Sequence, residues 1–187
     1  RNYNSLRKHK YVLKNARRKE TLCLRQLRPE VAIEKSTWFY LGNNTCMSML
    51  YNLLRINEMC KEHVENNFLP LPEAHVRDFQ AVRGAVDTLF ADTLDMMANG
   101  ELETVNLLRR HCDDIKDIIS DTYHNLHYQL REGDARSMTV LYVYLNTLQE
   151  TQEMVSAMRK FLRAFAKMRN TDYSGRPNRA SARPVTA

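Results

Sequence analysis

The chain has 187 residues, of which 43% are hydrophobic and 27% are charged, and it contains only five Gly and five Pro. This length can bury one sizeable core or two small ones, and the scarcity of chain breakers argues against a β-sandwich or barrel. The net charge is +6, but residues 1–28 hold ten Lys/Arg and one acid, Glu20, so the rest of the chain carries −3. Any basic surface therefore belongs to the N-terminal stretch.

The first predicted helix covers residues 2–27, because apolar residues recur there at helical spacing. Its expected inward positions are Leu6, Leu13, Ala16, Cys23 and Leu27. A row of basic side chains lies beside them: Arg7, Lys10, Lys14, Arg17, Arg25 and Arg28. Such a row is typical of a solvated face, or of a juxtamembrane segment attracted to anionic headgroups at about 1 kcal/mol per basic residue. Nucleic acid is not expected, since no stacking aromatics interleave with the row and no nucleic-acid-binding motif accompanies it.

Two further helices are predicted before residue 100. Pro29 ends or kinks the first helix, and the second is expected at 30–67, with Cys46, Leu50, Leu53, Cys60 and Val64 inward. Pro70 and Pro72 mark a connector, and a third helix is expected at 73–98, ended by the cap signal Asn99-Gly100. Its expected inward positions are Val76, Phe79, Val82, Val86, Leu89, Phe90 and Met97.

Residues 101–168 show the strongest helical periodicity, broken once at 132–134. One stripe comprises Leu102, Val105, Leu108, Cys112, Ile115, Ile118, Ile119, Leu126 and Leu130. The second comprises Met138, Leu141, Leu145, Leu148, Val155, Met158, Leu162 and Phe165. A tight turn between two long amphipathic helices predicts an antiparallel hairpin, so the fold class is all-α, an antiparallel bundle of about five long helices at 1–169. Residues 170–187 lose this periodicity and are predicted to form a disordered tail.

The chain carries no targeting or spanning signal and no disulfide pattern. The four cysteines form no CxxC pair and lie at or beside apolar helical positions, which predicts buried, reduced thiols as in a cytosolic protein. No run of about 18 apolar residues is present, so no segment is expected to span a membrane. No signal peptide is visible. The chain begins at Arg1 without a Met, and the missing Met suggests a part of a longer protein.

An internal echo links the two halves at an offset of 95 residues: Leu53–Met59 reads LLRINEM and Leu148–Met154 reads LQETQEM. The same offset aligns Leu50 with Leu145 and Leu13 with Leu108. The first helix thus corresponds to the fourth and the second to the fifth, which suggests a duplicated helical unit. The third helix would open the second repeat, and the opening helix of the first repeat would lie upstream.

The helix order, together with DTLDMMANGELETVNLL (92–108), HCDDIKDII (111–119) and YLNTLQETQEMVSAM (144–158), resembles the PhoU family of phosphate-signalling proteins. Members of this family consist of two three-helix repeats, and PhoU-like domains also occur as C-terminal cytoplasmic extensions of bacterial phosphate transporters. The resemblance implies a PhoU-like bundle whose first repeat lacks its opening helix.

The family's third and sixth helices typically carry acidic-x-x-x-Asp motifs, which hold metal clusters in some members. The corresponding positions here read Leu54-x-x-x-Glu58 and Gln149-x-x-x-Glu153. The remaining carboxylates are candidates for weak cation binding only: Glu58, Glu62, Glu150 and Glu153. Because a multinuclear site needs several converging carboxylates, we predict no metal and no other cofactor.

The sequence contains no signature of catalysis. The six His are scattered, none pairs recognisably with a Ser or Cys nucleophile, and there is no Walker loop and no GxGxxG motif. We therefore expect no enzymatic activity and no catalytic residues. No phosphate pocket is visible in the sequence either.

The resemblance implies a non-enzymatic regulatory domain of a phosphate transporter, on the cytoplasmic side of the bacterial inner membrane. It would dock its helix bundle on the transmembrane part of the same transporter. A membrane-proximal basic face would meet the anionic membrane surface: Arg7, Lys10, Lys14, Arg17 and Arg25. A homodimer is left open. The alternative is a free-standing helical adaptor that binds a signalling protein partner through a Met-rich or acidic face.

Overall fold

The computed structural model describes residues 2–26, 29–66, 69–129 and 135–169. Within these ranges the chain forms five α-helices and one short 3-10 turn, so the predicted all-α class is confirmed. The elements are α1 (Asn2–Leu24), α2 (Pro29–Glu65), α3 (Glu73–Asn99), η1 (Leu102–Thr104), α4 (Val105–Gln129) and α5 (Ala135–Arg169). The predicted tail at 170–187 lies outside the described residues.

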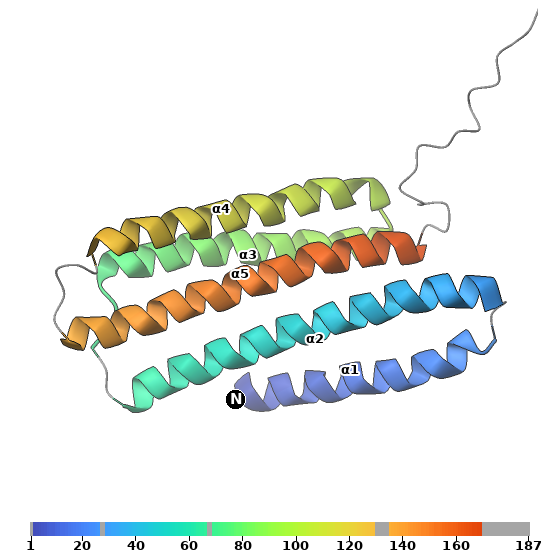
Figure 1. Ribbon diagram of the computed structural model, residues 1–187, viewed down its shortest axis with the longest axis horizontal. Helices are drawn as coiled ribbons and strands as arrows, with labels where there is room; N and C mark the ends of the chain where they lie inside the picture. The colour runs from blue at the N-terminus through green and yellow to red at the C-terminus, as the bar shows by residue number, and fades with distance from the viewer. Residues whose placement is uncertain (1, 27–28, 67–68, 130–134, 170–187) are drawn as a thin grey trace, which may run out of the picture.

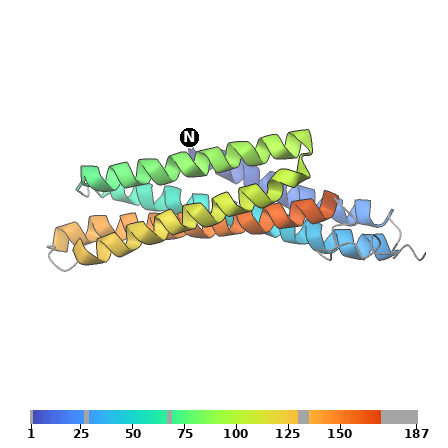
Figure 2. The same cartoon turned by 90° about the horizontal axis from the view of Figure 1, so that it is seen from above.

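The helices run back and forth along the long axis of an elongated bundle (Figures 1 and 2). The α2–α5 contact is the most extensive, and these two helices are antiparallel (Figure 1). On one side α1 packs against α2, and on the other α4 packs against α5 and α3 against α4. A smaller contact between α3 and α5 closes a three-helix unit. In the described part of the chain, no helix has the length and apolarity needed to cross a membrane.

Helix ends follow the local chemistry of Pro and Gly. Pro29 is the first residue of α2, where its missing N–H costs nothing and its fixed φ suits a helix start. Gly100 adopts a left-handed conformation (φ 75°) directly after α3, and its N–H donates to the Met96 carbonyl over 2.9 Å. The predicted cap at Asn99-Gly100 is therefore confirmed, since Gly takes this conformation without a Cβ clash.

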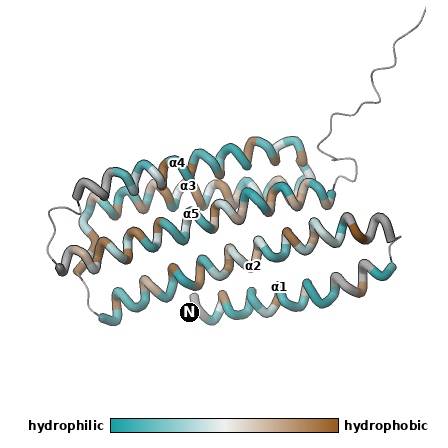
Figure 3. Tube along the Cα trace, viewed as in Figure 1, coloured by the Kyte–Doolittle hydropathy of each residue, from teal (hydrophilic) through white to brown (hydrophobic). Residues whose placement is uncertain are grey.

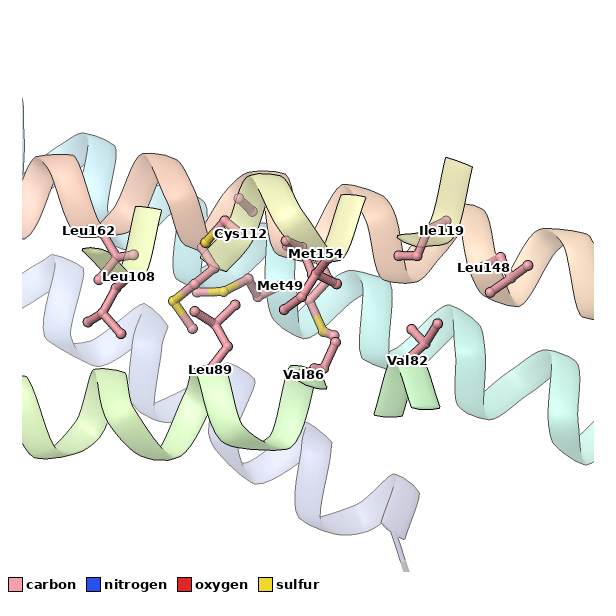
Figure 4. Close-up of a cluster of buried hydrophobic side chains, with 14 of the residues drawn as sticks. Met49, Val82, Val86, Leu89, Leu108, Cys112, Ile119, Leu148, Met154 and Leu162 are labelled. Carbon is pink, nitrogen blue, oxygen red and sulfur yellow. The ribbon is translucent and has the colours of Figure 1, made fainter. Parts of the chain in front are cut away.

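One apolar core joins four of the five helices (Figure 4). Leu89 of α3, Ile119 of α4 and Leu148 and Leu162 of α5 are almost completely buried in it. Met49 is the contribution of α2 to this cluster of buried side chains. The spacings of three and four that define the stripe of α5 place its inward residues opposite both α4 and α2, which explains the central position of α5.

The prediction that the first helix shares this core is wrong. None of the described side chains of α1 is buried, and Leu6, Leu13 and Ala16 are only half-buried. The reason is that α1 packs chiefly against α2, on the outside of the bundle, and its sequence is largely hydrophilic (Figure 3). Cys23 and Leu27 lie where side chains are not described.

Positions 95 residues apart on α2 and α5 differ in how deeply they are buried. Leu148 of α5 is 0% exposed, whereas Leu53, which aligns with it on α2, is 37% exposed. Val64, predicted inward on α2, is 72% exposed. The cause is that α5 packs against α2, α3 and α4, whereas α2 makes its main contacts with α5 and α1. The other predicted inward residues that are exposed are Cys60, Val76, Ile118 and Met138; the side chains of Leu126 and Leu130 are not described.

The prediction that the thiols are buried is confirmed only in part. Cys112 is buried and Cys46 half-buried, and burial raises the pKa of each thiol to about 11. Both are therefore protonated at neutral pH and weakly nucleophilic. Cys60 is exposed, contrary to the prediction.

Two glycines should respond in opposite ways to alanine. Gly84 is exposed within α3 and has open space around its Cα, so Gly84→Ala should raise the free energy of unfolding by about 0.5–1 kcal/mol. Gly100→Ala should lower it by about 1 kcal/mol, because φ is +75° and a Cβ would also lie 3.3 Å from the Arg169 side chain. Urea unfolding of the two variants beside the parent checks both signs. Stabilisation by Gly100→Ala would contradict the cap geometry.

Candidate functional site

A polar groove of about 950 Å³ lies between the two central helices. We call it the α2–α5 groove. Its polar lining includes Ser48, Tyr51, Asn52 and Arg55 from α2, Gln149, Gln152, Glu153, Ser156 and Lys160 from α5, and Tyr123 from α4. The Tyr123 hydroxyl donates to the Leu145 carbonyl over 2.7 Å, which ties α4 to α5 beside the groove.

A network of charged and amide groups crosses this groove. Arg55 Nε donates to Glu150 Oε1 over 2.6 Å, and Arg55 Nη2 lies 3.6 Å from Glu153 Oε2. Asn52 Nδ2 donates to Glu150 Oε2 over 2.8 Å and to Glu153 Oε2 over 3.3 Å. Asn52 is buried, and its side chain therefore needs the partners that the two carboxylates supply.

The network favours the charged forms of its members. The Glu150 side chain is 17% exposed, so burial alone would raise its pKa. Hydrogen bonds from Arg55 and Asn52, together with the charge of Arg55, outweigh burial and hold the pKa of Glu150 below its ordinary value. The same hydrogen bond raises the pKa of Arg55. At neutral pH this is a closed ion pair rather than a proton-transfer group.

The Arg55–Glu150 contact joins two residues that are 95 apart, which is the offset of the internal echo. In two antiparallel helices related by a two-fold axis, equivalent positions meet where the axis passes. A contact at this offset is therefore what the predicted duplication would produce.

A second cavity, of about 620 Å³, lies between α1 and α2. We call it the α1–α2 pocket. It is lined by Arg7, Lys10, Tyr11 and Lys14 from α1 and by Tyr51, Leu54, Arg55 and Glu58 from α2. Lys10 Nζ lies 4.7 Å from the centre of the Tyr51 ring, a distance typical of a cation–π contact. Arg55 and Tyr51 line both cavities, so the pocket and the groove share a wall.

The predicted basic face is divided by the structure. Arg7, Lys10 and Lys14 line the α1–α2 pocket, and Arg17 lies over the Tyr40 ring of α2 at 4.8 Å. Arg25 is exposed beyond the end of α1. The basic row lies beside the contact between α1 and α2, because the half-buried residues of α1 occupy the contacting side. These residues are Leu6, Leu13 and Ala16.

The four predicted carboxylates do not form one cluster. Glu150 and Glu153 meet at Asn52 and Arg55 in the groove, whereas Glu58 lines the α1–α2 pocket. Glu62 is exposed on α2. Among the described residues, no three His, Cys, Asp or Glu side chains come close enough together to hold a metal ion.

Asn52, Arg55 and Tyr51 were not singled out by the sequence analysis. A signal was present for Asn52, because an amide falls between Met49 and Leu53 in the apolar stripe of α2. A polar residue at such a position needs a partner from another helix. Nothing in the sequence indicates that this partner is Glu150, since the pairing of α2 with α5 is a tertiary property.

No protein-family model, no curated protein and no solved structure matches this chain. The groove holds a satisfied ion-pair network, and the pocket holds basic and aromatic side chains with a single carboxylate. Such sites suit the binding of charged partners.

Proposed function

We propose that this chain is a PhoU-like regulatory domain of a phosphate transporter, on the cytoplasmic side of the bacterial inner membrane. It acts by docking its helix bundle on the transmembrane part of the same transporter, and it catalyses no reaction. The observation that carries the proposal is the position of the basic helix α1, which lies at the edge of the bundle and is attached chiefly to α2.

The edge position of α1 supports docking because the helix combines charge with uncovered apolar side chains. Tyr11 is 66% exposed and Val12 is 61% exposed, and Arg7, Lys10 and Lys14 lie on the same helix. Basic side chains next to exposed apolar ones favour contact with an anionic membrane surface or with the membrane-facing end of another helix bundle.

The arrangement of the helix pairs supports the resemblance to the PhoU family. The α1–α2 pair and the α4–α5 pair correspond at the offset of 95 residues, and their central helices meet at Arg55 and Glu150. The greater exposure of Leu53 relative to Leu148 is what a first repeat without its opening helix would show. These features agree with a duplicated helical unit.

The chemistry of the groove supports a binding role over a catalytic one. A general base or acid works best with a pKa near the working pH. The pKa of Glu150 lies below its ordinary value instead, and its charge is balanced by Arg55. The α2–α5 groove therefore offers fixed charges for recognition.

The genomic reading frame upstream of Arg1 tests the proposal. We expect it to encode several apolar membrane-spanning segments that continue in frame into α1. A start codon immediately before Arg1 would contradict a transporter domain.

The alternative of a helical adaptor is favoured by one specific observation. An apolar groove of about 500 Å³ lies between α2, α3 and α5, with Leu53, Ile56, Val76 and Phe79 in its lining. An amphipathic partner helix could place its apolar face there. Size-exclusion chromatography and pull-down with the parent and with a Val76→Asp variant test this. A monomer that captures no soluble partner, or captures it equally well with Val76→Asp, would count against the adaptor.

A further inference from the structure

We propose that the α1–α2 pocket binds an anion that carries more than one phosphate group, and that Arg55 links this site to the α2–α5 groove. The sequence alone gave no sign of such a pocket, because it forms only where α1 lies against α2. The inference rests on the proposed function only for the source of the anion. That source is a lipid headgroup if the domain meets the membrane, and a soluble phosphorylated effector otherwise.

The charge of the pocket carries the argument. Four cationic side chains line it, Arg7, Lys10, Lys14 and Arg55, against one carboxylate, Glu58. Arg55 is paired with Glu150, but within the described part of the chain no ion pair engages Arg7, Lys10 or Lys14. Cations that outnumber the carboxylates of a cavity repel one another, and an anion that enters relieves this repulsion.

The size and spacing of the pocket indicate the class of anion. Arg7, Lys10 and Lys14 follow one another at intervals of three and four on one side of α1, so they extend over about 10 Å at 1.5 Å per residue. Three basic side chains spread over this length can contact more than one phosphate group at the same time. The volume of about 620 Å³ lies within the range of small-molecule sites. A diphosphate, or a headgroup with two phosphates, fits both observations.

An aromatic residue restrains one of the cations. The contact of Lys10 with the Tyr51 ring restrains the ammonium group at the pocket wall. The Tyr11 and Tyr51 side chains also line the pocket, and phenolic hydroxyls donate hydrogen bonds to phosphate oxygens. A site with restrained donors loses less entropy when the anion binds than a row of free lysines.

Arg55 connects this pocket with the centre of the fold. Its guanidinium group has five N–H donors, and the contacts with Glu150 and Glu153 use Nε and Nη2. The remaining donors can contact an anion in the α1–α2 pocket while Glu150 stays bound. An anion in the pocket would then change the strength of the contact between Arg55 and Glu150. By thermodynamic linkage, a change in the α2–α5 groove that alters this contact would also change the affinity of the pocket for the anion.

Isothermal titration with pyrophosphate at low ionic strength tests the pocket, with cosedimentation on cardiolipin-containing vesicles as the second arm. The pocket variant is Lys10→Gln with Lys14→Gln. The matched control is Lys8→Gln with Lys19→Gln, which removes the same charge from exposed positions of α1 that do not line the pocket. We expect the pocket variant to weaken binding by about tenfold or more and the control to change it little. Glu58→Gln, which removes the one carboxylate, should tighten binding.

The outcomes separate the sources and the two proposals. Pocket-dependent binding of pyrophosphate supports a soluble phosphorylated ligand, and pocket-dependent binding of the vesicles alone supports a headgroup. Equal weakening by both variant pairs, or no binding in either arm, would overturn the site. If the upstream reading frame encodes no membrane spans but pyrophosphate still binds through Lys10 and Lys14, the proposed function fails and this inference stands.

Discussion

Leu148→Ala should lower the free energy of unfolding by about 3 kcal/mol or more. Leu148 is 0% exposed in the core where α5 meets its neighbours, so the substitution removes buried methyl groups and leaves a cavity that close-packed helices cannot fill. Urea or thermal unfolding monitored by circular dichroism at 222 nm measures the loss.

Leu53→Ala is the matched control, because Leu53 lies 95 residues before Leu148, on the neighbouring helix α2, and the chemical change is the same. Leu53 is 37% exposed, so the loss should be about 1 kcal/mol or less. The difference between the two losses of unfolding free energy measures how much more completely α5 is covered than α2. Equal losses would mean that α2 is covered as completely as α5, contrary to the fold described here.

Arg55→Met should lower the free energy of unfolding by about 1–2 kcal/mol at pH 7. The substitution removes the charged donor of Glu150, whose side chain is only 17% exposed, while Asn52 remains as its partner. Arg55 itself is 47% exposed, and solvent screening keeps the loss below that of a fully buried pair. Met keeps much of the aliphatic volume, so packing changes little.

The loss caused by Arg55→Met should depend on pH in a defined direction. The folded protein holds the pKa of Glu150 below its unfolded value, so this stabilisation is fully present above the unfolded pKa and is lost as the pH falls through the folded pKa. The difference between parent and variant should therefore be largest near pH 7 and shrink in the acidic range below about pH 4. Unfolding curves at several pH values between 3 and 7 give this difference directly.

Arg159→Met controls for the loss of a surface arginine on the other side of α5. Arg159 pairs with Asp113 of α4 over 2.9 Å, but both side chains are well exposed, at 39% and 44%. The expected loss is about 0.5 kcal/mol or less at every pH. If Arg55→Met and Arg159→Met gave the same loss and the same pH profile, the groove network would have no special role.

The helices could be predicted from the sequence because their signals are local. The stripes of 101–168 and the cap at Gly100 depend on residues three or four positions apart, and the structure contains α4, α5 and the left-handed Gly100. The first helix was also placed correctly in the chain, but its position in the bundle was not. Leu6 and Leu13 give the same pattern whether a helix enters the core or lies at its edge.

The site could be predicted only in part, since it depends on which helices become neighbours. Glu150 and Glu153 were recognised as candidate carboxylates, but Arg55 joins them only because α2 and α5 are antiparallel neighbours. Glu58 was grouped with them by sequence offset, although it lies in the pocket with Arg7 and Lys10. The charge of the basic row was visible in the sequence, whereas the cavity that gathers three of its members requires the packed α1–α2 pair.

Phosphate uptake by proteoliposomes tests the central claim that this domain regulates transport by docking. Three versions of the full-length transporter would be compared: the parent, one without residues 1–187, and one with Arg7, Lys10 and Lys14 changed to Gln. We predict that the deletion and the triple variant shift the initial rate of labelled phosphate uptake in the same direction, while the membrane part still transports. Identical uptake rates for all three versions would contradict the account.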